Sequence, residues 1–210
     1  MFNTQPGSVL DSYAEGQRYF MGEGKLNNAP GRLVADLKEH DIDYMVIGAV
    51  ALLAYGYPRF TEDIDVILSG AGLEKFHREM IGLGYLPAFE GVKKRLRSTR
   101  GGTPSELITA GEYPGDGKPK PVSFPDPSET SVDIDGVKFP TLEKLIELKL
   151  ASGMTAPDRL KDLADVQELI KIRGLSGDFG ERLNPYVREK YSELLAGVRH
   201  GYCNYIEEQS

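Results

Sequence analysis

The sequence has little of what several common classes of protein require. Among 210 residues there are one cysteine and no tryptophan. The single cysteine, Cys203, cannot form an internal disulfide, and no Cys/His cluster has the spacing of zinc ligands. There is no run of about 18 apolar residues, and the N-terminus lacks the basic and apolar regions of a secretory signal. We therefore expect a cytoplasmic protein that does not enter a membrane.

The charge balance excludes another class. A net charge of −7 argues against a protein that coats nucleic acid without selection. One short segment reverses this sign, with the basic residues Lys93, Lys94, Arg95, Arg97 and Arg100. This run is typical either of a surface that attracts an anionic substrate or of a charged strand edge that prevents aggregation.

The pattern of apolar residues predicts an α/β (α+β) fold, with a small mixed sheet, flanking helices and a helical C-terminal region. Residues 1–30 are rich in Gly, Asn and Ser and predict an N-terminal extension. Residues 31–139 predict a catalytic domain, in which helical segments alternate with short strands. Residues 140–210 predict helices, the first of them capped by Thr141. Within the catalytic domain, Asp135-Gly136 predicts a hairpin turn, and residues 111–127 predict a loop rich in Pro and Gly.

Two acidic residues on a predicted strand are the main functional signal. Residues two apart in a strand point to the same face, so Asp63 and Asp65 are expected to project together. Adjacent like charges raise each other's pKa unless a cation compensates them. Magnesium is the natural compensating ion, since it binds one or two carboxylates together with substrate phosphates. A bare Asp-x-Asp pair is equally typical of a solvated strand edge.

Upstream of this pair, a predicted strand ends at Gly48 and a helix of small residues follows. Backbone N–H groups at the start of a helix bind phosphate oxygens, and glycine lets a ligand approach closely. The segment from Ile47 to Ser69 therefore predicts a phosphate site beside a metal site.

The order strand, Gly48, small helix, Gly56-x-x-Arg59-x-Thr61-x-Asp63-x-Asp65 closely resembles the signature of the DNA polymerase β-like nucleotidyltransferase superfamily. It is most similar to the small bacterial branch that includes minimal nucleotidyltransferases and abortive-infection toxins. The resemblance covers about residues 30–175. One departure is Ala49, which stands where the superfamily usually has Gly or Ser, so that a hydroxyl is lost and the backbone N–H remains.

The resemblance implies further site residues. The superfamily carries a third acidic residue on a neighbouring strand, for which Glu106 is the candidate and Asp133 the alternative. Gly48, Ala49, Arg59 and Thr61 would bind phosphates or order the catalytic turn. Lys149, Lys161 and Asp162 match cations and an acid that lie near the nucleotide in the toxin-like enzymes, although a solvated helix face with local ion pairs explains them equally well.

The expected activity is a magnesium-dependent transfer of a nucleoside monophosphate from a nucleoside triphosphate (NTP), ATP or another, to an acceptor hydroxyl. Two Mg²⁺ ions are expected. The acceptor would be an RNA, a protein or a small molecule, and an antitoxin protein is the expected partner if the enzyme is a toxin. The alternatives are an antibiotic-modifying nucleotidyltransferase and an inactive relative that binds a partner.

Overall fold

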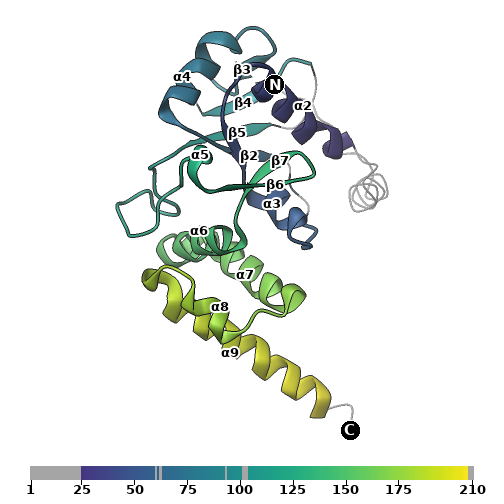
Figure 1. The fold of residues 1–210 in the computed structure, drawn as a ribbon, viewed down its shortest axis with the longest axis vertical. Helices are drawn as coiled ribbons and strands as arrows, with labels where there is room; N and C mark the ends of the chain where they lie inside the picture. The colour runs from purple at the N-terminus through teal and green to yellow at the C-terminus, as the bar shows by residue number, and fades with distance from the viewer. Residues whose placement is uncertain (1–24, 60, 62, 93, 101–103, 208–210) are drawn as a thin grey trace.

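The computed structural model describes residues 25–59, 61, 63–92, 94–100 and 104–207. It shows a mixed sheet with flanking helices, followed in the chain by a layer of helices (Figure 1), which confirms the predicted fold class. Most of the predicted N-terminal extension lies outside the described residues, while positions 25–30 belong to the first helix. No helix among the described residues is long and apolar enough to cross a membrane.

The sheet is built from five strands, and its connections place helices between them. The elements of this part are α2 (Lys25–Glu39), β1 (Tyr44–Val46), α3 (Gly48–Ala54), β2 (Ile64–Leu68), α4 (Gly70–Glu79), β3 (Tyr85–Pro87), β4 (Arg95–Ser98) and β5 (Ser105–Thr109). The strand order is β1-β2-β5-β4-β3, in which β2 and β5 are parallel and the other neighbours are antiparallel. The parallel register pairs Asp65 directly with Glu106.

Side chains alternate along β2, so that one face of the strand packs in the core and the other carries Asp65. We call the face that carries Asp65 the functional face. Ile64, Val66 and Leu68 are buried in the main hydrophobic core, where α4 also packs. Asp65 and Ile67 point to the opposite face, and Ile67 joins a second apolar cluster there. This two-residue period leaves an acidic residue on the functional face without exposing the rest of the strand.

A loop and a small hairpin connect the sheet to the helices. Residues 111–126 form the predicted loop, and the short helix α5 (Pro127–Thr130) follows it. The predicted hairpin is present as β6 (Ser131–Ile134) and β7 (Val137–Pro140), which form a separate two-stranded sheet within the described part of the chain. Its turn residues Asp135 and Gly136 both have positive φ, which explains the sequence signal.

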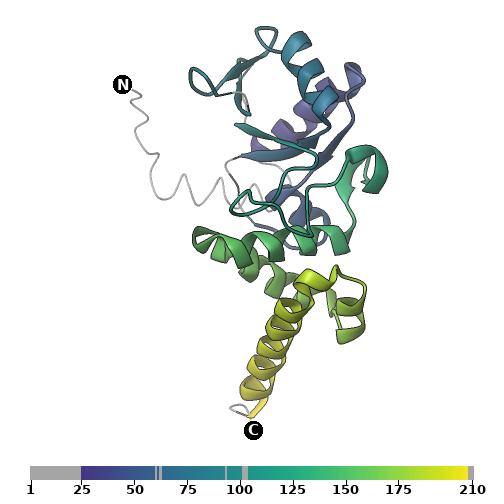
Figure 2. The ribbon, with the colours of Figure 1, turned by 90° about the vertical axis from the view of Figure 1, so that its left-hand side faces the viewer.

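The C-terminal helices form their own layer beneath the sheet (Figures 1 and 2). They are α6 (Leu142–Thr155), the 3₁₀ turn η1 (Pro157–Arg159), α7 (Leu160–Arg173), α8 (Gly177–Glu181) and α9 (Pro185–Glu207). Thr141 accepts a hydrogen bond from the Lys144 N–H and caps α6 as expected, and Gly174 ends α7 in the left-handed conformation. Buried Glu147 of α6 accepts a hydrogen bond from the Asn184 N–H, 2.6 Å away, and so joins α6 to the start of α9.

Some expected elements differ. The apolar spacing predicts a helix from Leu73 to Leu83, but α4 begins after the cap residue Ser69 and ends at Glu79. Gly82 and Gly84 have positive φ, so the chain turns there into β3, which the sequence pattern does not predict, and Leu83 is 73% exposed. Glycine's conformational freedom therefore outweighs the apolar spacing at this point.

Candidate active site

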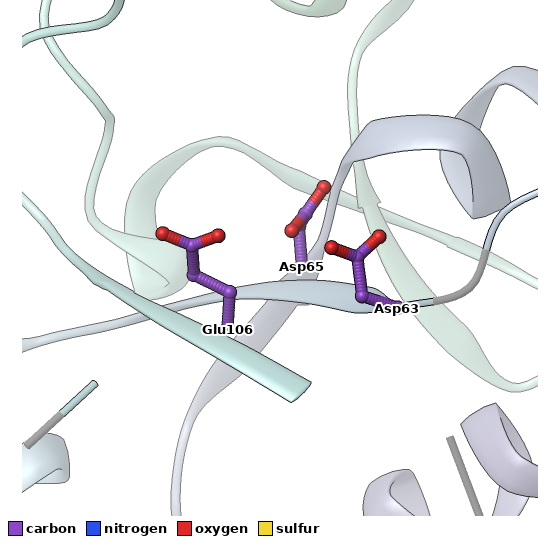
Figure 3. A group of neighbouring side chains, drawn as sticks. All are labelled: Asp63, Asp65 and Glu106. Atoms are coloured by element: carbon purple, nitrogen blue, oxygen red, sulfur yellow. The ribbon is translucent and has the colours of Figure 1, made fainter. Parts of the chain in front are cut away.

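Three carboxylates from two neighbouring strands meet on the functional face of the sheet. Asp63 lies just before β2, Asp65 is the second residue of β2, and Glu106 is the second residue of β5. Because β2 and β5 are parallel with Asp65 opposite Glu106, all three side chains rise from the same face (Figure 3). One oxygen from each lies within 4.8 Å of the others.

Thr61, two residues before Asp63 in the chain, fixes the direction of the Asp63 side chain. The Thr61 hydroxyl lies 2.9 Å from Asp63 Oδ1 and 3.0 Å from the Asp63 carbonyl oxygen, and it can donate a hydrogen bond to either. Thr61 thus closes the turn that leads into β2 and orients the carboxylate.

Gly48 makes room for Asp65. A Cβ atom built on Gly48 would lie 2.2 Å from Asp65 Oδ2, and the residue has φ of +66°, a conformation that side chains rarely adopt. The Ile47 N–H also donates to the Asp65 carbonyl oxygen at 2.9 Å. Only glycine allows the start of α3 to lie against this carboxylate.

Substituting Gly48 with alanine is therefore expected to destabilise the protein and displace Asp65. The left-handed backbone costs an alanine about 1–2 kcal/mol, and the collision with the carboxylate adds to it, so we expect a loss of about 2–3 kcal/mol. Denaturant unfolding measures this loss. Gly70→Ala is the matched control, because nothing lies within 4 Å of its Cβ position and its φ is not positive. An equal effect of both substitutions would contradict this account of Gly48.

The electrostatics of the cluster favour a cation. Burial, followed by the charges of Asp63 and Glu106, raises the pKa of Asp65 to about 6. Oxygens bound to one Mg²⁺ lie at most about 4.2 Å apart, since each bond is about 2.1 Å. The three carboxylate oxygens lie within 4.8 Å of one another, close to this spacing, so these residues fit a magnesium site.

The carboxylates lie in a cleft of about 560 Å³ between the sheet and the start of α7. Among the described residues, five cationic side chains line this cleft, namely Arg59, Arg95, Lys149, Arg159 and Lys161. Arg95 lies 3.6 Å from Glu106, and Arg59 lies 3.5 Å from Asp165 of α7. A cleft with a carboxylate floor and cationic walls suits a polyanion bound through divalent cations.

Lys149 and Asp162 lie in a buried network at the edge of the cleft. The Lys149 amine donates to Asp162 Oδ1 at 2.9 Å and to Asp165 Oδ2 at 2.7 Å, and Ser152 donates to Asp162 Oδ2 at 2.7 Å. Burial raises the pKa of Asp162, but the Lys149 charge and the two hydrogen bonds outweigh it, so that the pKa lies below its ordinary value. Both residues line the cleft, and neither lies on a solvated helix face.

The structure thus gathers most of the residues that the sequence indicated. Asp133, the alternative third carboxylate, lies in the separate hairpin, where it accepts a hydrogen bond from the Gly136 N–H at 2.8 Å. In the basic run, Lys94 pairs with Glu112 and Arg100 lies 3.7 Å from Asp36, while Lys93 lies outside the described residues.

Two residues at the cleft were not among those that the sequence indicated. Arg159 lines the cleft, and Asp165 links Lys149 to Arg59. Asp165 lies three residues after Asp162, a spacing that places both on one side of α7 and could have suggested a shared partner.

No protein-family model matches the sequence, and no curated protein is similar to it in sequence. Several solved structures have a similar fold. The antibiotic-resistance factor ANT(2'')-Ia is 16% identical, with a TM-score of 0.47, and the similarity covers 87% of this chain and 95% of that one. A nucleotidyltransferase-like protein from Paracoccidioides brasiliensis is 16% identical, with a TM-score of 0.45 over 70% and 76% of the two chains. The CdnE c-di-GMP synthase from Capnocytophaga granulosa is 14% identical, with a TM-score of 0.38 over 96% and 88%.

The similar solved structures are nucleotidyltransferases. At identities of 14 to 16%, the chemistry of this chain has to be inferred from the residues of its own site.

Proposed function

We propose that this protein is a magnesium-dependent nucleotidyltransferase that moves a nucleoside monophosphate from an NTP to an acceptor hydroxyl. The observation that carries the proposal is the convergence of Asp63, Asp65 and Glu106 within 4.8 Å in a cleft lined by cations. A solvated strand edge would not require the glycine at position 48 that lets the backbone lie against Asp65.

The three carboxylates divide the work of the reaction. Asp63 and Asp65 would hold Mg²⁺ between them, and Glu106 would complete the site from β5. When bound, Mg²⁺ neutralises the triphosphate and the leaving pyrophosphate. A Glu106 carboxylate oxygen would accept the proton of the acceptor hydroxyl.

The bonds that form and break follow from this arrangement. The acceptor oxygen bonds to the α-phosphorus of the NTP, and the bond from that phosphorus to the bridging oxygen of the β-phosphate breaks. Pyrophosphate leaves, and the proton passes from the acceptor to Glu106. Such transfers depend mainly on positioning and charge stabilisation.

The cations of the cleft would hold the triphosphate. The backbone N–H groups of Gly48 and Ala49, at the start of α3, would contact its phosphate oxygens. Arg159 and Lys161 are exposed at the other side of the cleft and can reach the same phosphates. Arg59 faces the cleft but also contacts Asp165, so its main task would be to order the catalytic turn.

Transfer is tested by incubating the protein with each radiolabelled NTP, Mg²⁺ and cell extract. Asp63→Ala is expected to lower the labelling at least about 100-fold, because a metal ligand is lost. Asp133→Ala is the control and should label as the native protein does, because Asp133 lies in the hairpin. If Asp63→Ala labels as strongly as the native protein, or if neither labels anything, the proposal fails.

We further infer a biological role as the toxin of a toxin–antitoxin or phage-defence pair, acting in the cytoplasm, where NTPs and Mg²⁺ are present. The similarity of the motif to abortive-infection toxins supports this role. Induced expression should arrest growth with the native sequence and not with Asp63→Ala. Normal growth would favour the antibiotic-modifying alternative. An assay that offers aminoglycosides and isolated tRNA as acceptors would identify this alternative if only the aminoglycosides are adenylylated.

A further inference from the structure

Two arginines of β4 lie on the functional face of the sheet, next to the cleft. The antiparallel register pairs Arg95 with Glu106 of β5, so both side chains point to the same side. Arg97 lies two residues further along β4 and shares this side, whereas Leu96 between them is buried in the main core. The arginines, about 7 Å apart along the strand, therefore extend the functional face from the carboxylates across β4.

The position of β4 in the sheet decides between the two interpretations of the basic run. β4 is an internal strand, which pairs with β5 on one side and with β3 on the other. Charged side chains that prevent aggregation belong on edge strands, whose backbone groups lack partners. Protection of a strand edge therefore does not explain these arginines, which leaves the attraction of an anionic ligand.

Two cations of the run are engaged in the fold, and two others face solvent. Lys94 and Arg100 each pair with an acidic side chain from another part of the chain. Arg95 has a 62% exposed side chain that lies 3.6 Å from Glu106. Arg97 is exposed and has no carboxylate partner among the described residues. In a protein with a net charge of −7, such a cation beside the cleft favours an anionic ligand there.

An exposed aromatic side chain lies in the connection from β3 to β4. Phe89 is 68% exposed, and no other phenylalanine among the described residues is exposed. The Ala88 N–H donates to the Arg95 carbonyl oxygen at 2.8 Å, so Phe89 directly follows a residue that is bonded to β4. Proteins that bind single-stranded nucleic acids combine cations along the phosphate backbone with aromatic rings on which bases stack. The connection and β4 together offer this combination.

We propose that Phe89, Arg95 and Arg97 form a surface, here called the acceptor surface, that binds a single-stranded polynucleotide and leads its terminal hydroxyl to Glu106. Arg95 would hold the phosphate nearest the reacting hydroxyl, because it lies beside Glu106, and Arg97 would hold another. Phe89 would stack on an unpaired base. The inference rests on the proposed function and narrows it, because it selects a polynucleotide among the possible acceptors.

Fluorescence anisotropy with a short, labelled, single-stranded RNA tests the acceptor surface, in EDTA and without NTP. The variants are Arg97→Gln and Phe89→Ala. Arg173→Gln is the control for the first, since Arg173 is exposed at the end of α7 and does not line the cleft. Ile172→Ala is the control for the second, since Ile172 is 46% exposed on the same helix. Thermal unfolding verifies that all four variants fold.

The native protein and both controls are expected to bind the RNA, and the two variants to bind it more weakly in different ways. Arg97→Gln should lower the slope of log affinity against log salt concentration by about 0.7, because one phosphate fewer is neutralised. Phe89→Ala should weaken binding at least about fivefold and leave that slope unchanged, because a stacked base releases no counterions. In transfer assays, both variants should raise the KM for a polynucleotide acceptor and not the KM for the NTP.

The proposal is overturned if the folded variants bind the RNA as their controls do. It is also overturned if polyglutamate of equal charge binds as tightly as the RNA and Phe89→Ala has no effect, because the surface would then serve an acidic protein segment. Since binding is measured without Mg²⁺ or NTP, it does not depend on catalysis. A native protein that binds the RNA as expected and transfers nothing would contradict the proposed function alone.

Discussion

Replacing Asp65 with asparagine is expected to abolish nucleotidyl transfer and, at the same time, to stabilise the metal-free protein. Burial and the charges of Asp63 and Glu106 raise the pKa of Asp65 to about 6. Keeping this carboxylate ionised at neutral pH therefore costs folding free energy, at about 1.4 kcal/mol for each unit of pKa shift. Removing the charge should raise the free energy of unfolding by about 2–3 kcal/mol. Loss of a metal ligand should lower kcat at least about 10³-fold.

The pH dependence of this gain has a defined sign. Because the folded state raises the pKa of Asp65, its contribution to stability is greatest below about pH 4 and is lost as the pH rises through about 6. The stability difference between Asp65→Asn and the native protein should therefore appear between about pH 4 and 6 and stay constant above that range.

Denaturant unfolding across this pH range measures the difference, with Asp178→Asn as a control on an exposed aspartate of α8. The control should change stability by no more than about 0.5 kcal/mol. Mg²⁺ should raise the Tm of the native protein and of the control, and not that of Asp65→Asn. A variant that is less stable than the native protein at pH 7 would show that the three carboxylates do not repel one another in the folded state.

The carboxylate pair could be predicted from sequence because its geometry is local. The two-residue period of a strand places Asp63 and Asp65 on one face whatever the rest of the chain does. The turn residues of the hairpin and the caps Thr141 and Gly174 follow from equally local rules. Glu106 needed more than a local rule, because its place beside Asp65 depends on the parallel register of β2 and β5.

The cationic part of the site could not be derived in this way. Arg59 and Asp165 lie far apart in the sequence, and their contact depends on how α7 packs beneath the catalytic turn. The sequence places Lys149 on a predicted helix, but it did not reveal that two aspartates of the next helix neutralise the amine. Long-range packing, which leaves no periodic signal, determines these contacts.

These contacts join the two parts of the protein at the cleft. Asp165 contacts Arg59 from the catalytic turn and Lys149 from α6, while Asp162 binds Lys149 and Ser152. The helical layer therefore fixes the turn that carries Asp63. A change in the buried network should alter both the stability of the fold and the geometry of the site.

Lys149→Met is expected to destabilise the protein by about 3–5 kcal/mol, since removal of one partner leaves two buried aspartates without their cation. Asp162 and Asp165 are 7% and 2% exposed, so water cannot replace the amine. Lys171→Met is the control, because Lys171 lies on α7 with a 39% exposed side chain and pairs only with Glu168 among the described residues, an ion pair that contributes about 0.5 kcal/mol. Denaturant unfolding at pH 7.5 measures both variants.

The destabilisation should shrink at lower pH and in a compensated variant. In Lys149→Met the charge that lowers the pKa of Asp162 is gone, so the Asp162 carboxylate can take up a proton and the deficit in stability falls as the solution is acidified. Adding Asp162→Asn and Asp165→Asn should recover most of the stability, because no buried charge then lacks a partner.

If this triple variant folds and binds NTP as the native protein does, Lys149 is structural alone. If it folds and its NTP affinity falls at least tenfold, the network also serves the nucleotide, through the Lys149 charge or through the Asp162 carboxylate, both of which line the cleft. Asp165→Asn by itself, which keeps both of those groups, then separates a contact with the nucleotide from an effect on the catalytic turn.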